Sequence, residues 1–243
     1  MDNKILLTTG VLGGMGPQAT VDFMSKVIQQ TPALLDQDHL PLIIDHNTLV
    51  PNRHKSLNGT GIDAKEPLKR MAIKLETAGA DFLVMVCNTA HAYQEDIRAA
   101  TTIPFISIVD EVTSYIQTHY PDVKKVGIMA AEGCLEANIY QSALSNNRYV
   151  PIQWDKVQSQ QFMKLLFEIK TGNFDDDSTK AMTILANDLK AKGAEVIIAG
   201  CTEIPLVMTA QDIDIPLIES TDILVKQTIA YATQQLTLPT NQI

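Results

Sequence analysis

The chain has 243 residues, of which 45% are hydrophobic and 19% charged, a composition typical of one large or two small globular domains and not of a disordered or fibrous protein. Its net charge of −9 argues against nucleic acid or an anionic membrane as a partner. No apolar run approaches the roughly 18 residues of a membrane helix and the N-terminus does not resemble a signal peptide, so we expect a cytoplasmic protein with free thiols.

The first half of the chain alternates short apolar runs with segments of helical spacing. The runs predict strands at residues 4–12, 40–45, 81–86 and 103–109, and the helical spacing predicts helices at 19–30, 66–78 and 90–100. Residues 47–61 are polar and rich in turn residues, which predicts a long loop of functional or mobile character.

The second half repeats this plan. It predicts strands at residues 123–130, 195–199 and 215–218, and helices at 136–144, 162–170, 178–192 and 222–235. Alternating strands and helices indicate an α/β fold with mainly parallel sheets. Landmarks of the halves also match, because Cys87 and Cys201 lie 114 residues apart, as do Gly79 and Gly193. We therefore expect two similar α/β domains related by pseudo-twofold symmetry, formed by residues 1–108 with 219–243 and by residues 109–218.

Two of the three cysteines follow predicted buried strands directly. Cys87 and Cys201 thus fall at the carboxyl ends of parallel strands, where ligands bind, and before expected helix starts, where a thiolate is favoured. If pseudo-twofold symmetry places the two cysteines face to face across a cleft between the domains, one thiolate can remove a proton from a tetrahedral carbon. The other thiol can then protonate the opposite face of that carbon. The alternative for both is that each is simply a small buried side chain. For Cys134 we favour a structural role or a place in the lining of a pocket.

Three motifs resemble those of the aspartate/glutamate racemase family, and specifically its aspartate racemase branch. They are Gly13-Gly14-Met15-Gly16-Pro17-Gln18-Ala19-Thr20, Cys87-Asn88-Thr89-Ala90-His91 and Gly200-Cys201-Thr202-Glu203. The resemblance covers nearly the whole chain. It implies a cofactor-independent racemase, commonly a homodimer, that acts on a small dicarboxylic amino acid at a site between its two domains. It also implies that Cys87 and Cys201 are the paired acid and base.

Further site residues follow from the same resemblance. Arg53 and Lys170 match residues that bind the two substrate carboxylates, and Met15, Asn88, Thr89 and Thr202 belong to the motifs that line the site. Considered alone, Arg53 can be a solvated loop residue, Lys170 can complement the end of a helix, and Asn88 and Thr89 can cap one. The chain departs from the family where Asn52 replaces the commoner aspartate before Arg53 and where Cys134 replaces a threonine.

Other functions stay open at this point. The glycine turn lacks the spacing of a dinucleotide-binding motif or a phosphate-binding loop, and two cysteines without clustered histidines provide too few ligands for a metal, so we expect neither cofactor nor metal. Maleate isomerases and hydantoin racemases use the same cysteine positions. A protein that binds small dicarboxylates without catalysis is the remaining alternative.

Overall fold

The computed structural model describes residues 6–240 and divides the chain into two compact units. One unit comprises Met1–Glu111 with Thr221–Ile243, and the other comprises Val112–Ser220. Of the strand expected at residues 4–12, Lys4 and Ile5 lie outside the described residues, as does the N-terminal sequence on which the cytoplasmic expectation rests. Within residues 6–240, no helix combines the length and apolar character that crossing a membrane requires.

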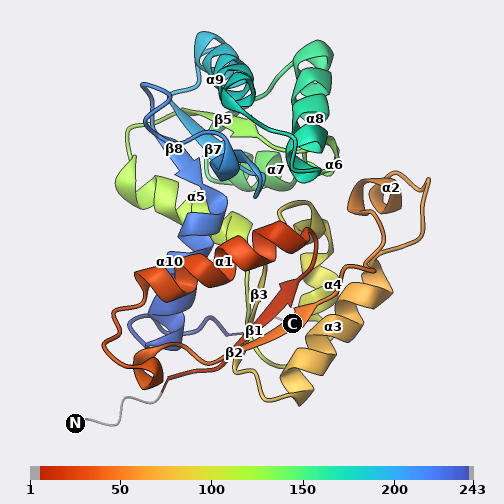
Figure 1. Cartoon of the computed structure of the whole chain (residues 1–243), viewed down its shortest axis with the longest axis vertical. Coiled ribbons are helices and arrows are strands. Elements are labelled where there is room, and N and C mark those ends of the chain that lie inside the picture. Colours follow the sequence, from red (N-terminus) through yellow and green to blue (C-terminus); the bar gives the residue numbers. More distant parts are fainter. Residues whose placement is uncertain (1–5, 241–243) are drawn as a thin grey trace. The chain divides into compact units, whose positions relative to one another are not determined.

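The first unit contains a four-stranded parallel sheet in the order β2-β1-β3-β4, with helices packed around it (Figure 1). Its strands are β1 (Thr9–Gly13), β2 (Leu42–His46), β3 (Phe82–Met85) and β4 (Phe105–Ile106). Its α-helices are α1 (Pro17–Gln30), α2 (Arg53–Leu57), α3 (Lys65–Thr77), α4 (Gln94–Arg98) and α10 (Ser220–Ala232), and its 3₁₀ helices are η1 (Asp36–Asp38) and η2 (Thr89–Tyr93). One division between the units falls within helix α5 (Ile108–His119), and the other falls after Ser220, the first residue of α10.

The second unit contains a parallel sheet of the same size in the order β6-β5-β7-β8. Its strands are β5 (Lys125–Met129), β6 (Val150–Ile152), β7 (Val196–Ala199) and β8 (Leu217–Glu219). Its helices are α6 (Glu132–Glu136), α7 (Ile139–Asn146), α8 (Lys156–Lys170), α9 (Asp176–Ala191) and the 3₁₀ helix η3 (Ile204–Leu206). The two sheets therefore share one strand order, which confirms the predicted α/β class with parallel sheets.

A glycine in the first strand of each sheet allows a helix to pack closely against it. A Cβ added at Gly10 would lie 3.2 Å from Leu75 of α3 and 2.7 Å from Leu83 of the neighbouring strand. A Cβ at Gly127 would lie 3.4 Å from Leu189 of α9 and 3.1 Å from Ile197 of the neighbouring strand. Because these contacts recur at matching positions of the two sheets, a small residue is required at both Gly10 and Gly127 for the same packing reason.

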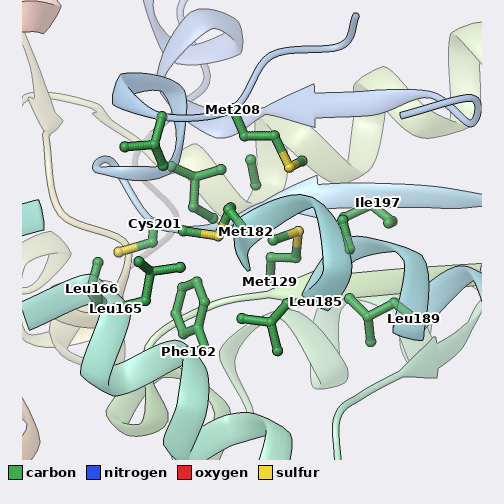
Figure 2. Close-up of a cluster of buried hydrophobic side chains, with 14 of the residues drawn as sticks. Met129, Phe162, Leu165, Leu166, Met182, Leu185, Leu189, Ile197, Cys201 and Met208 are labelled. Carbon is green, nitrogen blue, oxygen red and sulfur yellow. The ribbon is translucent and has the colours of Figure 1, made fainter. Parts of the chain in front are cut away.

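Each unit has its own hydrophobic core, and each core includes one of the two strand-end cysteines. Cys87 packs in a cluster with Leu12, Met15 and Met85. Cys201 lies at one end of the cluster formed by β7, α8 and α9, beside Leu166 and Met182 (Figure 2). Both side chains are only 7% exposed. Both cysteines are thus buried like small apolar side chains, which agrees with the alternative interpretation of these residues.

Several predicted elements are wrong in type or extent. Residues 103–109 contain only the two-residue strand β4, because the Ser107 hydroxyl accepts a hydrogen bond from the Asp110 N–H at 3.4 Å and helix α5, which was not predicted, begins at Ile108. The helix expected at residues 90–100 is η2 followed by α4. In the second unit Asn138, with φ 52°, separates α6 from α7 where one helix was expected, and β6 was not predicted.

Candidate active site

Cys87 lies just beyond the carboxyl end of β3. The Val86 N–H donates to the Leu12 carbonyl at 3.1 Å, so the chain stays beside β1 almost up to the cysteine. After Cys87 the backbone turns into η2, a 3₁₀ helix of five residues. The dipole of a regular helix, which was expected to favour a thiolate here, is therefore replaced by a short turn with poorer alignment.

His91 holds the Cys87 backbone in place. Its Nε2 accepts a hydrogen bond from the Ile108 N–H at 3.1 Å, so the ring proton is on Nδ1, which donates to the Cys87 carbonyl at 2.8 Å. Burial is the main cause that lowers the pKa of His91 to about 4. The neutral imidazole thus connects the end of β3 to the start of α5, a role for which the sequence carried no signal beyond the motif itself.

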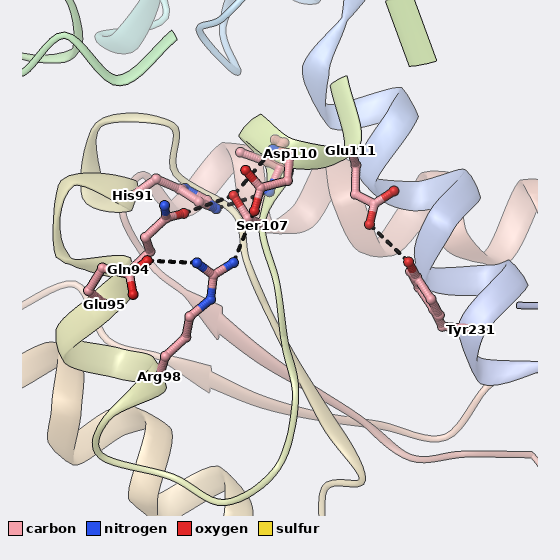
Figure 3. Close-up of polar contacts among 9 residues, drawn as sticks. His91, Gln94, Glu95, Arg98, Ser107, Asp110, Glu111 and Tyr231 are labelled. Carbon is pink, nitrogen blue, oxygen red and sulfur yellow. Dashed lines mark hydrogen bonds and ion pairs between the residues drawn. The ribbon is translucent and has the colours of Figure 1, made fainter. Parts of the chain in front are cut away.

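Polar side chains around His91 strengthen this connection. The Ser107 hydroxyl donates to Gln94 Oε1 at 2.9 Å, and Arg98 of α4 forms an ion pair with Asp110 of α5 at 3.0 Å (Figure 3). The exposed ion pair contributes little free energy by itself. Together these contacts fix the segment after Cys87 against α5 at several points.

Asn88 and Thr89, predicted to contact the substrate, follow Cys87 directly. Asn88 is buried and is the residue before η2, but its side chain forms no capping hydrogen bond. Thr89 is half-buried and begins η2. The capping alternative is therefore wrong for Asn88, whereas a substrate contact by either residue stays a prediction.

Arg53 is bound to the protein rather than solvated. Its Nη1 donates to the carbonyls of Val50 and Pro51, both at 3.1 Å, and its Nη2 donates to the Met15 carbonyl at 3.4 Å. The Asn52 side chain caps α2 by accepting from the Lys55 N–H at 3.1 Å, so asparagine is compatible with this helix start. These contacts orient the guanidinium of Arg53 and bring Met15 and Arg53 together, two of the predicted substrate-binding residues.

The segment at residues 47–61 is more ordered than the expected long loop. It contains α2, whose Ser56 hydroxyl forms hydrogen bonds with the Tyr93 hydroxyl and with the Ala64 N–H, the latter at 2.9 Å. Tyr93 belongs to η2, the turn that follows Cys87. Helix α2, which carries Arg53, is thus tied to the turn after Cys87 within one unit.

The second unit places Cys201 just beyond the carboxyl end of β7, with a carboxylate beside its sulfur. Cys201 Sγ donates to Glu203 Oε2 at 3.0 Å, and the Thr202 hydroxyl donates to the same oxygen at 3.1 Å. The other oxygen of Glu203 lies 3.5 Å from Lys170 Nζ at the end of α8. Three predicted site residues therefore meet at Glu203, which is only 6% exposed and was not predicted as a site residue although it lies in the quoted motif.

This environment raises the pKa of the Cys201 thiol. Burial is the largest cause, the negative charge of Glu203 adds to it, and the positive charge of Lys170 opposes it. The expectation that position alone favours a thiolate at Cys201 is therefore wrong. The element that follows is η3, only three residues long, and a carboxylate faces the sulfur.

Cys134 is fully buried in α6. Burial is the main cause that raises the pKa of the nearby Tyr140 hydroxyl, the thiolate forms of Cys134 and Cys201 would raise it further, and a hydrogen bond to Ser220 opposes them. The Ser220 hydroxyl donates to the Ala199 carbonyl at 2.9 Å, and the Tyr140 ring would lie 3.0 Å from a Cβ at Gly200. These contacts support the end of β7. Within residues 6–240, no group of three or more metal-binding side chains comes together.

Residues 12–228 match the sequence model of the Asp/Glu/hydantoin racemase family. The chain belongs to this family. Membership identifies it as a racemase, an isomerase, and confirms the resemblance seen in the three motifs. The residue roles implied by that resemblance are a separate matter and remain predictions.

Relatives and solved structures agree with this assignment. The chain is 30% identical over 230 residues to the broad specificity amino-acid racemase RacX of Bacillus subtilis (strain 168), covering 91% of this chain and 96% of the relative. The fold matches Picrophilus torridus aspartate racemase with a TM-score of 0.82 at 23% identity, covering 93% and 94% of the two chains. It matches glutamate racemase isoform RacE1 from Bacillus anthracis with a TM-score of 0.68 at 18% identity, covering 97% and 84%. The structural likenesses show the shared fold.

Proposed function

We propose that this racemase interconverts L- and D-aspartate, with glutamate as a second substrate, by two-base proton transfer between Cys87 and Cys201 without a cofactor. One observation carries the proposal. In each of two units with the same strand order, a buried thiol lies two residues beyond the end of a strand, Cys87 after β3 and Cys201 after β7. Two equivalent thiols match the requirement of a reaction that needs one proton acceptor and one proton donor.

In the proposed reaction the two cysteines act in turn on the α-carbon of the substrate. The thiolate of one cysteine takes the α-hydrogen of the amino acid, and the electron pair of the broken C–H bond stays on the α-carbon. The thiol of the other cysteine then delivers its proton to the opposite face of that carbon and becomes the new thiolate. The mechanism requires both sulfurs to reach one α-carbon, and inversion returns the enzyme with its two protonation states exchanged.

The carboxylates of the substrate need cationic partners that also stabilise the developing carbanion. The three carbonyl contacts of Arg53 are made by Nη1 and Nη2, so Nε and a second hydrogen of Nη2 are the donors proposed for a substrate carboxylate. Lys170 is the proposed partner of the second carboxylate, with its ammonium at Glu203 when substrate is absent. Met15, Asn88, Thr89 and Thr202 are proposed as the remaining contacts.

A wider substrate range is the second candidate, because RacX is described as broad in specificity and covers nearly the whole chain. Isomerisation of maleate, racemisation of hydantoins, and binding of dicarboxylates without turnover are the further alternatives. Each differs from aspartate racemisation in the compound that exchanges its α-hydrogen with solvent or in the product that forms.

The test is incubation of the reduced protein in D₂O, without pyridoxal phosphate, with L-aspartate, L-glutamate, a neutral and a basic amino acid, a hydantoin or maleate. Chiral chromatography measures inversion and proton NMR measures loss of the α-hydrogen. We expect D-aspartate that carries deuterium, and a loss of about 10²-fold or more in Cys87→Ser and Cys201→Ser. Cys134→Ala is the matched control and should retain turnover. No inversion or exchange of any amino acid by the wild-type protein would refute the proposal.

A further inference from the structure

Cys201 and Cys87 occupy equivalent places in their sheets, yet their neighbours differ. The Cys201 thiol donates to a carboxylate oxygen of Glu203 at 3.0 Å. The backbone N–H of Glu203 acts in the opposite sense, because it favours the thiolate and lowers the pKa of the thiol. One residue therefore offers an acceptor to the thiol form of Cys201 and a donor to its thiolate form. For Cys87, the contact of the neighbouring His91 is to the backbone carbonyl and leaves the sulfur out.

We propose that Glu203 is the proton relay of Cys201, accepting the thiol proton when Cys201 has to act as a base. This inference rests on the proposed function for its role in turnover. The coupling between the Cys201 thiol and the Glu203 carboxylate can be measured without a substrate.

The relay step conserves charge within the buried pair. The Sγ–H bond of Cys201 breaks, the proton bonds to Glu203 Oε2, and the electron pair remains on sulfur. The pair carries one negative charge before and after, so the transfer does not add a second charge to a site where both residues are less than 10% exposed. The thiolate then takes the α-proton and becomes a thiol again, while Cys87 protonates the opposite face of the carbon and becomes a thiolate. The proton held by Glu203 finally passes through solvent to the Cys87 thiolate, which restores the starting charges.

The groups around the pair fit such a relay. The Thr202 hydroxyl holds Glu203 Oε2 in place at 3.1 Å, and Lys170 of α8 lies 3.5 Å from Oε1. Because the ammonium favours the carboxylate form of Glu203, it helps the relay to lose its proton after turnover. From α7, the buried hydroxyl of Tyr140 is a further titratable group whose charged form interacts with Cys201, and Cys134 of α6 interacts with Tyr140.

The pH dependence of Cys201 alkylation by iodoacetamide, followed by mass spectrometry of the Cys201 peptide, tests the pair directly. In Glu203→Gln the amide oxygen still accepts from the thiol but the negative charge is gone. We expect the midpoint of the profile to fall by about one pH unit, which makes alkylation roughly tenfold faster near pH 7.5. Lys170→Met should move the midpoint in the opposite direction, by less because Lys170 is partly exposed.

Turnover supplies the second readout. Glu203→Gln should racemise aspartate at least tenfold more slowly although its thiol is more reactive, and Glu203→Asp should recover part of the rate. Asp177→Asn, which removes an exposed carboxylate paired with Lys180 at 2.7 Å in the same unit, is the matched control and should change neither readout.

Each outcome decides between the two claims. A Cys201 profile that does not move in Glu203→Gln and in Lys170→Met overturns the relay, whatever the activity. Faster alkylation with unchanged or faster racemisation also overturns it, since Glu203 would then only suppress the thiolate. Wild-type protein that exchanges no α-hydrogen, while the two variants shift the profile in opposite directions, overturns the proposed function and retains the proton coupling of the pair.

Discussion

Replacing His91 should destabilise the first unit in a manner that depends on pH. The imidazole makes two buried hydrogen bonds, to the Cys87 carbonyl at 2.8 Å and from the Ile108 N–H at 3.1 Å. A buried polar group left without its partner costs about 1–3 kcal/mol. His91→Leu leaves two such groups, so we expect the free energy of unfolding at pH 7 to fall by about 2–6 kcal/mol.

The pH dependence follows from the lowered pKa of His91. The folded protein binds this proton near pH 4, whereas the unfolded chain binds it near the ordinary value of 6.5. Between these values the unfolded state holds more protons, so acidification destabilises the folded state. From pH 7 to pH 4.5 the linkage amounts to roughly 2 kcal/mol. His91→Gln, whose amide oxygen can still accept from Ile108, has no such titration.

Urea unfolding followed by far-ultraviolet circular dichroism at pH 7 and pH 4.5 measures both effects. The stability advantage of the wild type over His91→Gln should shrink by roughly 2 kcal/mol on acidification, because all other titrating groups are common to both proteins. Fluorescence of Trp154, the single tryptophan, reports the second unit and shows whether unfolding spreads to it. A wild-type advantage that stays constant between the two pH values would refute the assignment of a buried neutral imidazole.

Three further predictions concern packing and substrate binding. Gly10→Ala should lower the free energy of unfolding by about 2–3 kcal/mol and Gly127→Ala by about 1–2 kcal/mol. The reason is that the added Cβ meets its neighbours at 2.7 Å in the first variant and at 3.0 Å in the second. Urea unfolding measures both losses, and a larger loss in Gly127→Ala would contradict this explanation. Arg53→Lys should lower kcat/KM for aspartate about 10-fold to 100-fold, since one ammonium cannot replace a guanidinium held by three carbonyls; initial rates equal to those of the wild type would exclude the role of Arg53. Tyr93→Phe removes the hydrogen bond to Ser56 and should cost about 1 kcal/mol, with faster amide exchange in α2 by mass spectrometry, whereas unchanged exchange would show that this bond does not anchor the helix.

Buried strands and amphipathic helices were the predictable part of the fold. Strands β3 and β7 are continuous apolar runs, and α3 and α9 show clear helical spacing before a glycine, so their positions follow from period and punctuation. Helix α5 was missed because its first apolar residues continue the run that contains β4. The edge strand β6 has three residues with a proline in the middle, and a segment this short has no period to detect.

The cysteines of the candidate site were predictable by position, but their surroundings were not. A residue two positions after a buried parallel strand must lie near the carboxyl edge of the sheet, so the locations of Cys87 and Cys201 follow from the topology. Whether a nearby side chain contacts the backbone or the sulfur depends on how the following turn folds. His91 lies four residues after Cys87 and reaches its carbonyl, while Glu203 lies two residues after Cys201 and reaches its thiol.

This difference between the cysteines has a consequence for the kinetics of the proposed racemase. The equilibrium constant between two enantiomers is one, so kcat/KM must be equal in the two directions for the wild type and for every variant, however unlike the two thiols are. An asymmetry between Cys87 and Cys201 therefore has to appear in kcat and in KM separately. If Glu203 must accept a proton only when Cys201 is the base, Glu203→Gln should lower kcat more in that direction and lower the corresponding KM in proportion. Equal reductions of kcat in both directions, with KM unchanged in both, would mean that the carboxylate acts on the two half-reactions alike, and the contact between Cys201 and Glu203 would not distinguish acid from base.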